Sequence, residues 1–330
     1  MGNQQAQADA KAALCQDMAA LCKNNPYLPD REGYKRIALS DREWINPMLL
    51  AEDGLATDSC FGTYYLWGDA FGLRVSAVGG RLLASLGSGD KLRFYYPHGS
   101  GSLKEALLEM GRKARKHQAD LVIGSVTRKQ KEALELAMPG FVFQEKRSMA
   151  DYIYKTEELA ALSGKRFHGK KNHCNRFERE NPDWHSEILE EGHIPDCLKL
   201  LAQWEENHKE AQDEMQGAER TAIAKAFLHY RELGMEGIVL YAGGQIVGFS
   251  FGEPIGEEGF DVHFEKADTG IHGAYAMVNR QMARMIQERL PKAWWLNREE
   301  DMGLENLRKA KESYHPAFLA EKYVARIPVG

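Results

Sequence analysis

Two groups of polar side chains follow short strand-like segments in the C-terminal part of the chain. They are Glu265, Lys266 and Asp268, and then Asn297, Arg298, Glu299 and Asp301. Because ligands bind where adjacent strands of an α/β sheet end, we expect both groups to line one cleft. Glu265 and Asp301 are predicted to be catalytic, because a carboxylate binds an amine or accepts a proton, and the others to bind substrate. The alternative is a structural ion pair between Glu265 and Arg298.

Three further side chains are predicted to contact substrate in this cleft. Alternation along residues 260–265 places His263 on the same sheet face as Glu265. Burying polar side chains on a sheet face costs free energy unless they contact water or form hydrogen bonds. We therefore expect this face to line a cleft. Lys311 and Tyr314 lie in the next segment with a helical pattern. The alternative interpretation is that Lys311 is a surface residue and that Tyr314 is buried where it caps the helix.

A glycine-containing loop, with Gly270 and Gly273, precedes a helix predicted from about Ala274. The first N–H groups of a helix have no partner within the helix and carry partial positive charge. The loop is therefore predicted to suit a phosphate group or a developing oxyanion.

A basic segment, GKRFHGKKNHCNRFERE at residues 164–180, carries six basic side chains against two acidic ones. If the segment is helical, Arg166 and Lys170 share one face. Arg and Lys contact phosphates, so the segment is predicted to bind phosphate or RNA. The predicted contact residues are Lys165, Arg166, Lys170, Lys171 and Arg176. A solvated helix face is the alternative interpretation.

The composition is that of an ordinary globular protein, with 43% apolar and 28% charged residues among 330. The net charge of −5 argues against general coating of nucleic acid but allows a local basic groove. No apolar run approaches 18 residues, so no transmembrane segment is expected. The five cysteines form no CxxC pair and no zinc-site spacing, so we predict reduced thiols, a cytoplasmic protein and no metal site.

Strand and helix patterns alternate along the chain and predict an α/β (α+β) protein with mixed sheets. Hairpins are predicted at Gly79–Gly80 and Gly243–Gly244. Helices are predicted at residues 8–23, 41–51, 102–117, 128–138, 157–180, 194–208 and 218–233, with a final strand at 318–327. The second half has the element order of the acetyltransferase-like (GNAT) fold. We therefore predict two tandem GNAT-like domains, residues 1–155 and 156–330, the first a degenerate copy and the second carrying the site.

The chain resembles the catalytic region of bacterial phosphatidylglycerol lysyltransferases and their free-standing relatives. The resemblance rests on four blocks in the right order: GTYYLWGDAF (62–71), GKRFHGKKNHCNRF (164–177), GFSFGEPIGEEGFDVHFEKAD (248–268) and WWLNREEDMGLENLRKAKESYHP (294–316). It implies two acetyltransferase-like domains in tandem. The loop KADTGIHGA departs from the acetyltransferase pyrophosphate signature, Arg/Gln-x-x-Gly-x-Gly/Ala.

By this resemblance the chain is an acyltransferase, an aminoacyltransferase that takes its acyl group from charged tRNA. The acceptor is an amine or hydroxyl, on a small molecule or a lipid headgroup. Transfer from acetyl-CoA or another acyl-CoA is the first alternative, with the cofactor at the Gly270–Gly273 loop. A non-catalytic RNA- or ligand-binding protein is the second alternative.

Overall fold

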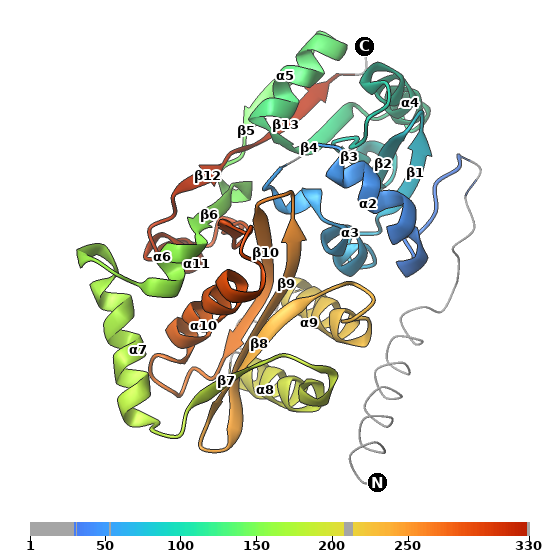
Figure 1. Cartoon of the computed structure of the whole chain (residues 1–330). Coiled ribbons are helices and arrows are strands. Elements are labelled where there is room, and N and C mark those ends of the chain that lie inside the picture. The colour runs from blue at the N-terminus through green and yellow to red at the C-terminus, as the bar shows by residue number, and fades with distance from the viewer. Residues whose placement is uncertain (1–29, 31, 53, 208–213, 329–330) are drawn as a thin grey trace.

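The structure is a computed structural model that describes residues 30, 32–52, 54–207 and 214–328. Its strands form two mixed sheets, one mainly from each half of the chain (Figure 1). The helix predicted at residues 8–23 lies outside the described residues. Within them, no helix combines the length and apolar character needed to cross a bilayer.

The first sheet comprises six strands in the order β1-β2-β3-β4-β13-β5. Their bounds are β1 (Arg74–Val78), β2 (Arg81–Leu86), β3 (Arg93–Tyr95), β4 (Leu121–Thr127), β5 (Val142–Glu145) and β13 (Lys322–Ile327). The helices of this half are α2 (Arg42–Leu50), α3 (Phe61–Trp67), α4 (Leu103–Lys116) and α5 (Arg128–Ala137).

The second sheet comprises seven strands in the order β12-β6-β11-β10-β9-β8-β7. Their bounds are β6 (Asp151–Lys155), β7 (His185–Ile188), β8 (Glu236–Ala242), β9 (Gln245–Ile255), β10 (Gly259–Ala267), β11 (Trp295–Asn297) and β12 (Phe318–Ala320). The helices are α6 (Thr156–Ala161), α7 (His168–Glu180), α8 (Ile194–Asn207), α9 (Glu214–Leu228), α10 (Ala274–Arg289) and α11 (Glu305–Glu312).

The predicted tandem arrangement is visible in the strand pairing of both sheets. Each sheet has antiparallel strands and one parallel pair, β3 with β4 and β10 with β11, and each pair is joined by a helix. The predicted hairpins at Gly79–Gly80 and Gly243–Gly244 are confirmed, and all four glycines have positive φ, which residues without a Cβ adopt at little cost. The fold is two GNAT-like α/β units in tandem.

The two halves exchange their last strands, which the sequence did not indicate. Strand β6, expected to close the first sheet, pairs with β11 and β12 in the second sheet. The final strand, expected in the second sheet, is broken after Ala320, and β13 inserts between β4 and β5 of the first sheet. A boundary at residue 155 therefore divides the sequence into two halves, but each sheet contains a strand from the other half.

The predicted helix at residues 157–180 is also wrong in part, because the structure divides it into α6 and α7. Leu162 and Gly164 have φ values of 45° and 84°, so the backbone leaves the right-handed helical region there. Helix α7 then packs against α10 on one face of the second sheet, and α8 and α9 cover the other face (Figure 1). This packing places the basic segment beside the loop that precedes α10.

Candidate functional site

Strands β10 and β11 separate at the point where the sequence predicted a cleft. Their parallel pairing ends at Asp261 and Asn297, while β10 continues to Ala267. Beyond Asn297 the backbone stays paired with β6, with Arg298 N–H donating to the Tyr152 carbonyl at 3.1 Å. The side chains that follow β11 therefore lie beside the free part of β10.

A register shift in β10 divides the predicted cleft into two clusters. The pairing of β10 with β9 shifts between Asp261 and Phe264, so side chains no longer alternate regularly there. His263 contacts residues of the first half, whereas Glu265 contacts Asn279 of α10. The prediction that His263 and Glu265 share one sheet face is wrong, because that alternation requires an unbroken ladder.

The first cluster is an ion pair under an aromatic ring, which we call the Arg298 cluster. Arg298 Nη2 lies 2.9 Å from Glu265 Oε1, and Asn279 donates to Glu265 Oε2 at 3.3 Å. The guanidinium lies 4.7 Å from the ring centre of Tyr314, and Lys170 Nζ lies 4.0 Å from the same ring. Among the described residues, buried Arg298 Nη1 has no hydrogen-bond partner. The ion pair between Glu265 and Arg298, which the sequence offered as the alternative to a cleft, is therefore present, and one guanidinium nitrogen is left unused.

The electrostatics of the Arg298 cluster favour an added anion. Burial and the nearby Arg298 lower the pKa of Lys170. Burial also lowers the pKa of Arg298, but Glu265 raises it more, so the guanidinium stays charged. Two cations against one carboxylate in a half-buried site stabilise a bound carboxylate, phosphate or oxyanion.

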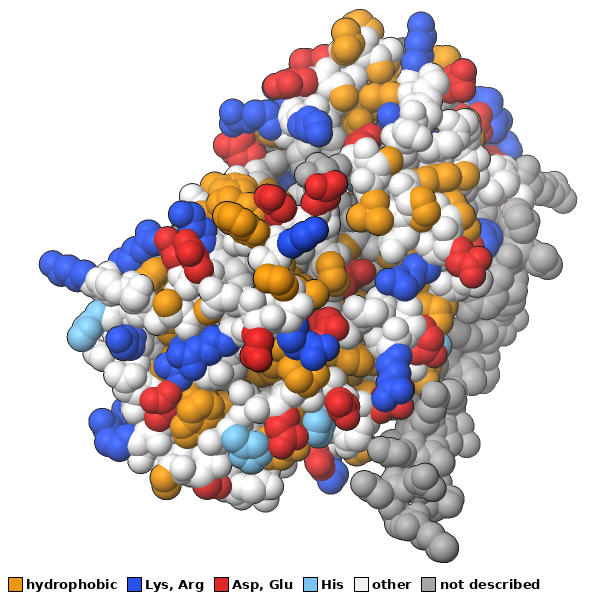
Figure 2. Space-filling model, in the orientation of Figure 1, with side chains coloured by type: hydrophobic (Ala, Val, Ile, Leu, Met, Phe, Trp, Pro, Cys, Tyr) orange, Lys and Arg blue, Asp and Glu red, His pale blue; other side chains and the backbone are white. Residues whose placement is uncertain are grey.

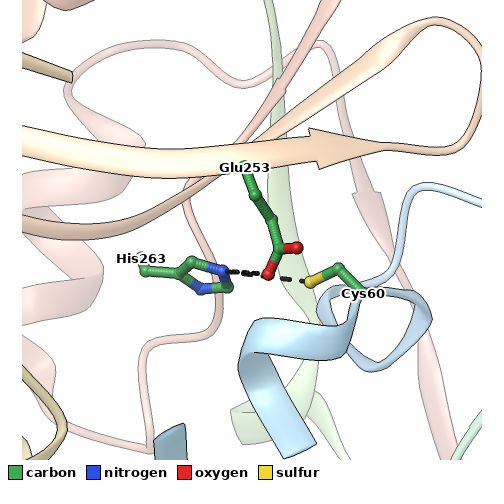
Figure 3. Close-up of side chains that lie close together, drawn as sticks. All are labelled: Cys60, Glu253 and His263. Carbon is green, nitrogen blue, oxygen red and sulfur yellow. Dashed lines mark hydrogen bonds and ion pairs between the residues drawn. The ribbon is translucent and has the colours of Figure 1, made fainter. Parts of the chain in front are cut away.

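The second cluster, the His263 cluster, lies between the two halves of the chain. His263 Nε2 lies 3.0 Å from Glu253 Oε1 (Figure 3). The other ring nitrogen, Nδ1, lies 3.0 Å from Glu299 Oε1. Cys60 Sγ is 4.0 Å from Nε2, and Asp261 Oδ2 is 3.8 Å from Nδ1. Burial lowers the pKa of His263, but Asp261 and the other carboxylates raise it more. Burial raises the pKa of Asp261.

A second layer of polar contacts joins the His263 cluster to both sheets. Thr57 donates from Oγ1 to Asp261 at 2.6 Å and from its N–H to Asp151 at 2.9 Å. Asp151 also pairs with Lys322 of β13 at 2.9 Å, and the same Lys322 Nζ lies 3.1 Å from Asp58. These contacts connect the segment before α3, strand β6 and strand β13.

Asn297 and Glu299 support these two clusters from the end of β11. Asn297 is buried, donates to the Leu55 carbonyl at 2.7 Å and accepts from Glu299 N–H at 2.6 Å. Glu299 has a φ of 55°, a conformation that L-residues rarely adopt. That conformation directs the Glu299 carboxylate to His263 while Arg298 contacts Glu265. Such local strain is common at functional sites.

Asp301 and Lys311 lie next to the clusters but are fully engaged. Asp301 accepts hydrogen bonds from five donors, in Tyr152, Arg147, Arg308 and the Gly303 N–H. Burial raises its pKa, but Arg308 and Tyr152 lower it more. Buried Lys311 donates to the carbonyls of Arg298 and Glu300 at 2.5 Å, and burial lowers its pKa to about 8. Lys311 therefore secures the segment that carries Arg298.

Lys266 and Asp268 lie on the α8 and α9 side of β10, away from the Arg298 cluster. Lys266 pairs with Glu219 at 2.9 Å and lies 3.8 Å from the Trp204 ring centre. Asp268 Oδ1 accepts from Gly270 N–H at 2.8 Å and closes the loop before α10. A cavity of about 440 Å³ adjoins this loop, lined by Leu200, Ala202, Gln203, Trp204, Glu206, Asn207, Asp268 and Thr269.

Helix α7 covers the glycine loop. A Cβ at Gly273 would lie 2.3 Å from the carbonyl oxygen of His173, so the two backbones are in close contact. The rings of His173 and His272 lie 5.0 Å apart. Gly273, with φ of 84°, thus permits the close approach of α7, and the N–H of Gly270 is already used.

The predicted phosphate-binding residues differ in their availability. Arg166 pairs with Glu158 at 2.5 Å and Arg176 with Glu180 at 2.7 Å. Lys165 and Lys171 are exposed and form no ion pair within the described part of the chain. On the face shown in Figure 2, Lys and Arg side chains gather where α7 lies, with acidic groups between them.

Local sequence patterns did not predict Cys60, Glu253 and the polar residues around Thr57 as site residues. One signal was available: Glu253 lies at the end of the apolar segment GFSFGEPI, where a charged residue on a central strand needs a partner. The contact of Cys60 with His263 spans 203 positions, so no local pattern could indicate it.

Comparison with known proteins places the chain in a family. Residues 54–326 match the family model described as phosphatidylglycerol lysyltransferase, C-terminal. A conserved protein of unknown function from Bacteroides thetaiotaomicron is 38% identical and has a TM-score of 0.83, over 89% of this chain and 99% of that one. The C-terminal domain of a putative lysylphosphatidylglycerol synthetase from Agrobacterium fabrum shares the fold at 12% identity, with a TM-score of 0.64 over 87% of this chain and 91% of that one.

A curated relative is an uncharacterized protein of Mycoplasmoides gallisepticum. It is 23% identical over 182 residues, which are 54% of this chain and 57% of the relative. The chain therefore matches little more than half of that relative's length.

Proposed function

Because the chain belongs to the family of phosphatidylglycerol lysyltransferase C-terminal domains, we propose that it is an aminoacyltransferase that uses charged tRNA. The observation that supports this proposal best is the unused donor of Arg298. One guanidinium nitrogen is held by Glu265, and buried Nη1 is left without a partner beside Lys170. A buried donor next to a second cation is suited to the negative oxygen that develops during acyl transfer.

The proposed reaction is the transfer of an aminoacyl group from the ribose ester of tRNA to an amine or hydroxyl acceptor. The acceptor atom attacks the ester carbonyl, and Arg298 Nη1–H donates to the resulting oxyanion. Glu265 Oε2, which accepts only a 3.3 Å hydrogen bond from Asn279, takes the proton of the attacking group. The C–O bond to the ribose then breaks and the ribose oxygen takes up a proton.

Glu265 is preferred to Asp301 as the base because of hydrogen bonding. Asp301 already accepts five hydrogen bonds, whereas the second oxygen of Glu265 has one long contact. A carboxylate saturated by donors is a weak base. In this proposal Asp301 maintains the structure of the segment after β11.

The position of α7 favours tRNA over CoA as the carrier of the acyl group. This helix occupies the region over the glycine loop where an acyl-CoA pyrophosphate was expected, and Lys171 on α7 and Lys165 in the turn just before it are exposed to solvent. A CoA-dependent acyltransferase therefore has less support here. A protein that binds RNA without turnover remains an outcome of the test below.

The proposal is tested by measuring transfer of labelled amino acid from a mixture of charged tRNAs to soluble amines and to lipid vesicles. Arg298→Lys, which keeps the charge but loses the planar donor pair, should lower kcat at least about 100-fold. Glu265→Gln should lower kcat similarly, because an amide cannot take the proton of the attacking group. Lys104→Ala, on exposed α4, is the matched control and should have no effect. Turnover of acetyl-CoA without transfer from any tRNA would contradict the proposal.

A salt titration tests the role of α7 in tRNA binding. Replacing Lys165 and Lys171 by Ala should reduce the slope of log affinity against log salt by about 1.4 to 1.8, because each lost phosphate contact contributes about 0.7 to 0.9. Filter binding at several salt concentrations measures that slope. The double variant Lys91→Ala/Lys104→Ala, with two exposed lysines in the first half, should leave it unchanged. Equal slopes for all three proteins would exclude α7 from the tRNA site.

A further inference from the structure

Three metal-binding side chain types meet in the buried core of the His263 cluster. Cys60, Glu253 and His263 come from the segment before α3, from β9 and from β10 (Figure 3). Their nearest ligand atoms all lie within 4.8 Å of one another, with Nε2 3.0 Å from Oε1 and 4.0 Å from Sγ. The whole set is buried.

The spacing of these atoms matches the ligand sphere of a tetrahedral zinc ion. At ordinary Zn–N, Zn–O and Zn–S bond lengths, tetrahedral geometry separates the nitrogen and oxygen by about 3.4 Å and the sulfur and nitrogen by about 3.6 Å. The observed 3.0 and 4.0 Å are each within half an ångström of those values. A small rotation of the side chains is sufficient to admit the ion.

The groups around the three ligands hold them in position, as the residues around a metal site do. The second ring nitrogen of His263 lies 3.0 Å from Glu299, which orients the imidazole so that Nε2 faces Glu253 and Cys60. Glu253 Oε1 also accepts from the Gly62 N–H at 2.7 Å, which fixes the carboxylate. Asp261 Oδ2 lies 3.5 Å from Cys60 Sγ, and buried Asp261 Oδ1 has no partner among the described residues. Asp261 lies on the Nδ1 side of the His263 ring, in a neighbouring group with Glu299, so its side chain must rotate toward Cys60 Sγ to become a fourth ligand.

The charge of the cluster is unbalanced without an added cation. Glu253, Asp261 and Glu299 each lie within 4.0 Å of His263, and in the described part of the chain no Lys or Arg forms an ion pair with any of the three. One imidazolium does not balance Glu253 and Glu299, and burial raises the pKa of the third carboxyl group, Asp261, to about 8, so that without a cation it holds a proton. A divalent cation removes that imbalance.

We propose that Cys60, Glu253 and His263 bind a zinc ion, with Asp261 as the fourth ligand. The thiolate, imidazole and carboxylate set favours zinc over magnesium or calcium, which prefer oxygen ligands alone. Binding releases the thiol proton of Cys60 and the Nε2 proton of His263 to solvent. The ion joins the segment before α3 to β9 and β10, and so connects the first half of the chain to the second sheet.

The competing arrangement contains no metal. In that arrangement an imidazolium donates to Glu253 and Glu299, and a neutral Cys60 thiol donates to the Thr57 carbonyl, 3.1 Å away. The two arrangements differ in zinc affinity and in the ionisation of Cys60, so both properties are measured directly.

The experiment measures zinc binding by competition with a chelator in the full chain. Cys15 and Cys22 are changed to Ser in every protein, so that Cys60, Cys174 and Cys197 are the thiols that remain. The parent protein should bind one zinc ion and give the thiolate-to-cobalt absorption band with Co²⁺. Cys60→Ala should weaken zinc binding more than about 100-fold and abolish the band, and Glu299→Gln should weaken it about 10-fold. Cys174→Ala removes another buried thiol and should change neither property.

Two results would overturn the proposal. One is a parent protein that binds no zinc, or binds it no more tightly than Mg²⁺. The other is equal zinc affinity in the parent and in Cys60→Ala. If Cys60→Ala does not fold, Glu253→Gln preserves side-chain volume and should still weaken zinc binding, so a Glu253→Gln protein with parental affinity overturns the proposal as well. None of these readouts depends on aminoacyl transfer.

Discussion

At the scale of single residues, a substitution of Asp301 measures how much a buried carboxylate with all its hydrogen bonds formed contributes to the stability of the fold. Its side chain is fully buried, and Arg147 and Arg308 both bind it from partly exposed positions. Asp301→Asn should lower the free energy of unfolding at pH 7 by about 2 kcal/mol, because hydrogen bonds to a charged group are lost. Urea unfolding measures the change.

The effect of Asp301 should depend on pH in a defined direction. Its pKa in the folded protein is below the ordinary value of about 4, so its contribution is complete above that value and is lost as the pH falls through the folded pKa. The difference between wild type and Asp301→Asn should therefore shrink below about pH 4. Glu312→Gln is the control, since exposed Glu312 also pairs with Arg147 and should contribute less than about 0.5 kcal/mol. A difference that grows on acidification would contradict this assignment.

At the scale of secondary structure elements, two glycines in helices should respond oppositely to alanine. A Cβ at Gly62, in α3, would lie 2.1 Å from Glu253 Oε1 and 3.0 Å from His263 Nε2. Gly62→Ala should therefore destabilise the protein by about 2 kcal/mol, as overpacking does. A Cβ at Gly169, near the start of α7, would meet no heavy atom within 4 Å, and Gly169→Ala should stabilise the protein by about 0.5 kcal/mol.

Thermal and urea unfolding of both variants measure this difference. The pair is matched because the same substitution is made in a helix each time and only the surroundings differ. Equal effects of the two substitutions would show that α3 does not approach β9 and β10 as closely as described.

The irregularity in β10 explains why this strand serves two clusters. The register shift between Asp261 and Phe264 lets His263 point toward α3 while Glu265 points toward α10. An unbroken ladder would place both on one face of the strand. The β-bulge thus supplies polar groups to both sides of one central strand.

At the scale of the whole molecule, Lys322 joins the two sheets. It belongs to β13 in the first sheet and pairs with Asp151 of β6 in the second sheet, at 2.9 Å, as well as with Asp58. Burial lowers its pKa, but the carboxylates of Asp151 and Asp58 raise it far more, so Lys322 stays charged. Lys322→Met should leave buried carboxylates unpaired and destabilise the protein by about 3 kcal/mol or more.

This prediction is checked by urea unfolding followed with probes in both halves. The exchange of β6 and β13 should make both halves unfold in one transition in the wild type. Lys104→Met, at an exposed lysine of α4, should change the stability by less than about 0.5 kcal/mol. A loss below about 1 kcal/mol for Lys322→Met would mean that the carboxylates reach solvent or take up protons.

The local features of this protein follow directly from its amino-acid sequence. Glycine pairs predicted both hairpins, because positive φ is a property of the residue itself. The polar residues that end β10 and β11 predicted the contact of Glu265 with Arg298, because parallel strands joined by a helix bring their ends together. Element order and four sequence blocks predicted the tandem fold and the family.

How distant segments meet depends on the packing of the whole chain. The exchange of β6 and β13, the bulge in β10 and the meeting of Cys60 with His263 depend on packing between residues that are up to 206 positions apart, as Leu121 and Ile327 are. Nothing in the local pattern distinguishes a last strand that pairs within its own half from one that inserts into the other sheet, since both bury the same side chains. Which residues contact a buried charged side chain depends on how the strands pair. The residues of the His263 cluster are therefore known only from the folded chain.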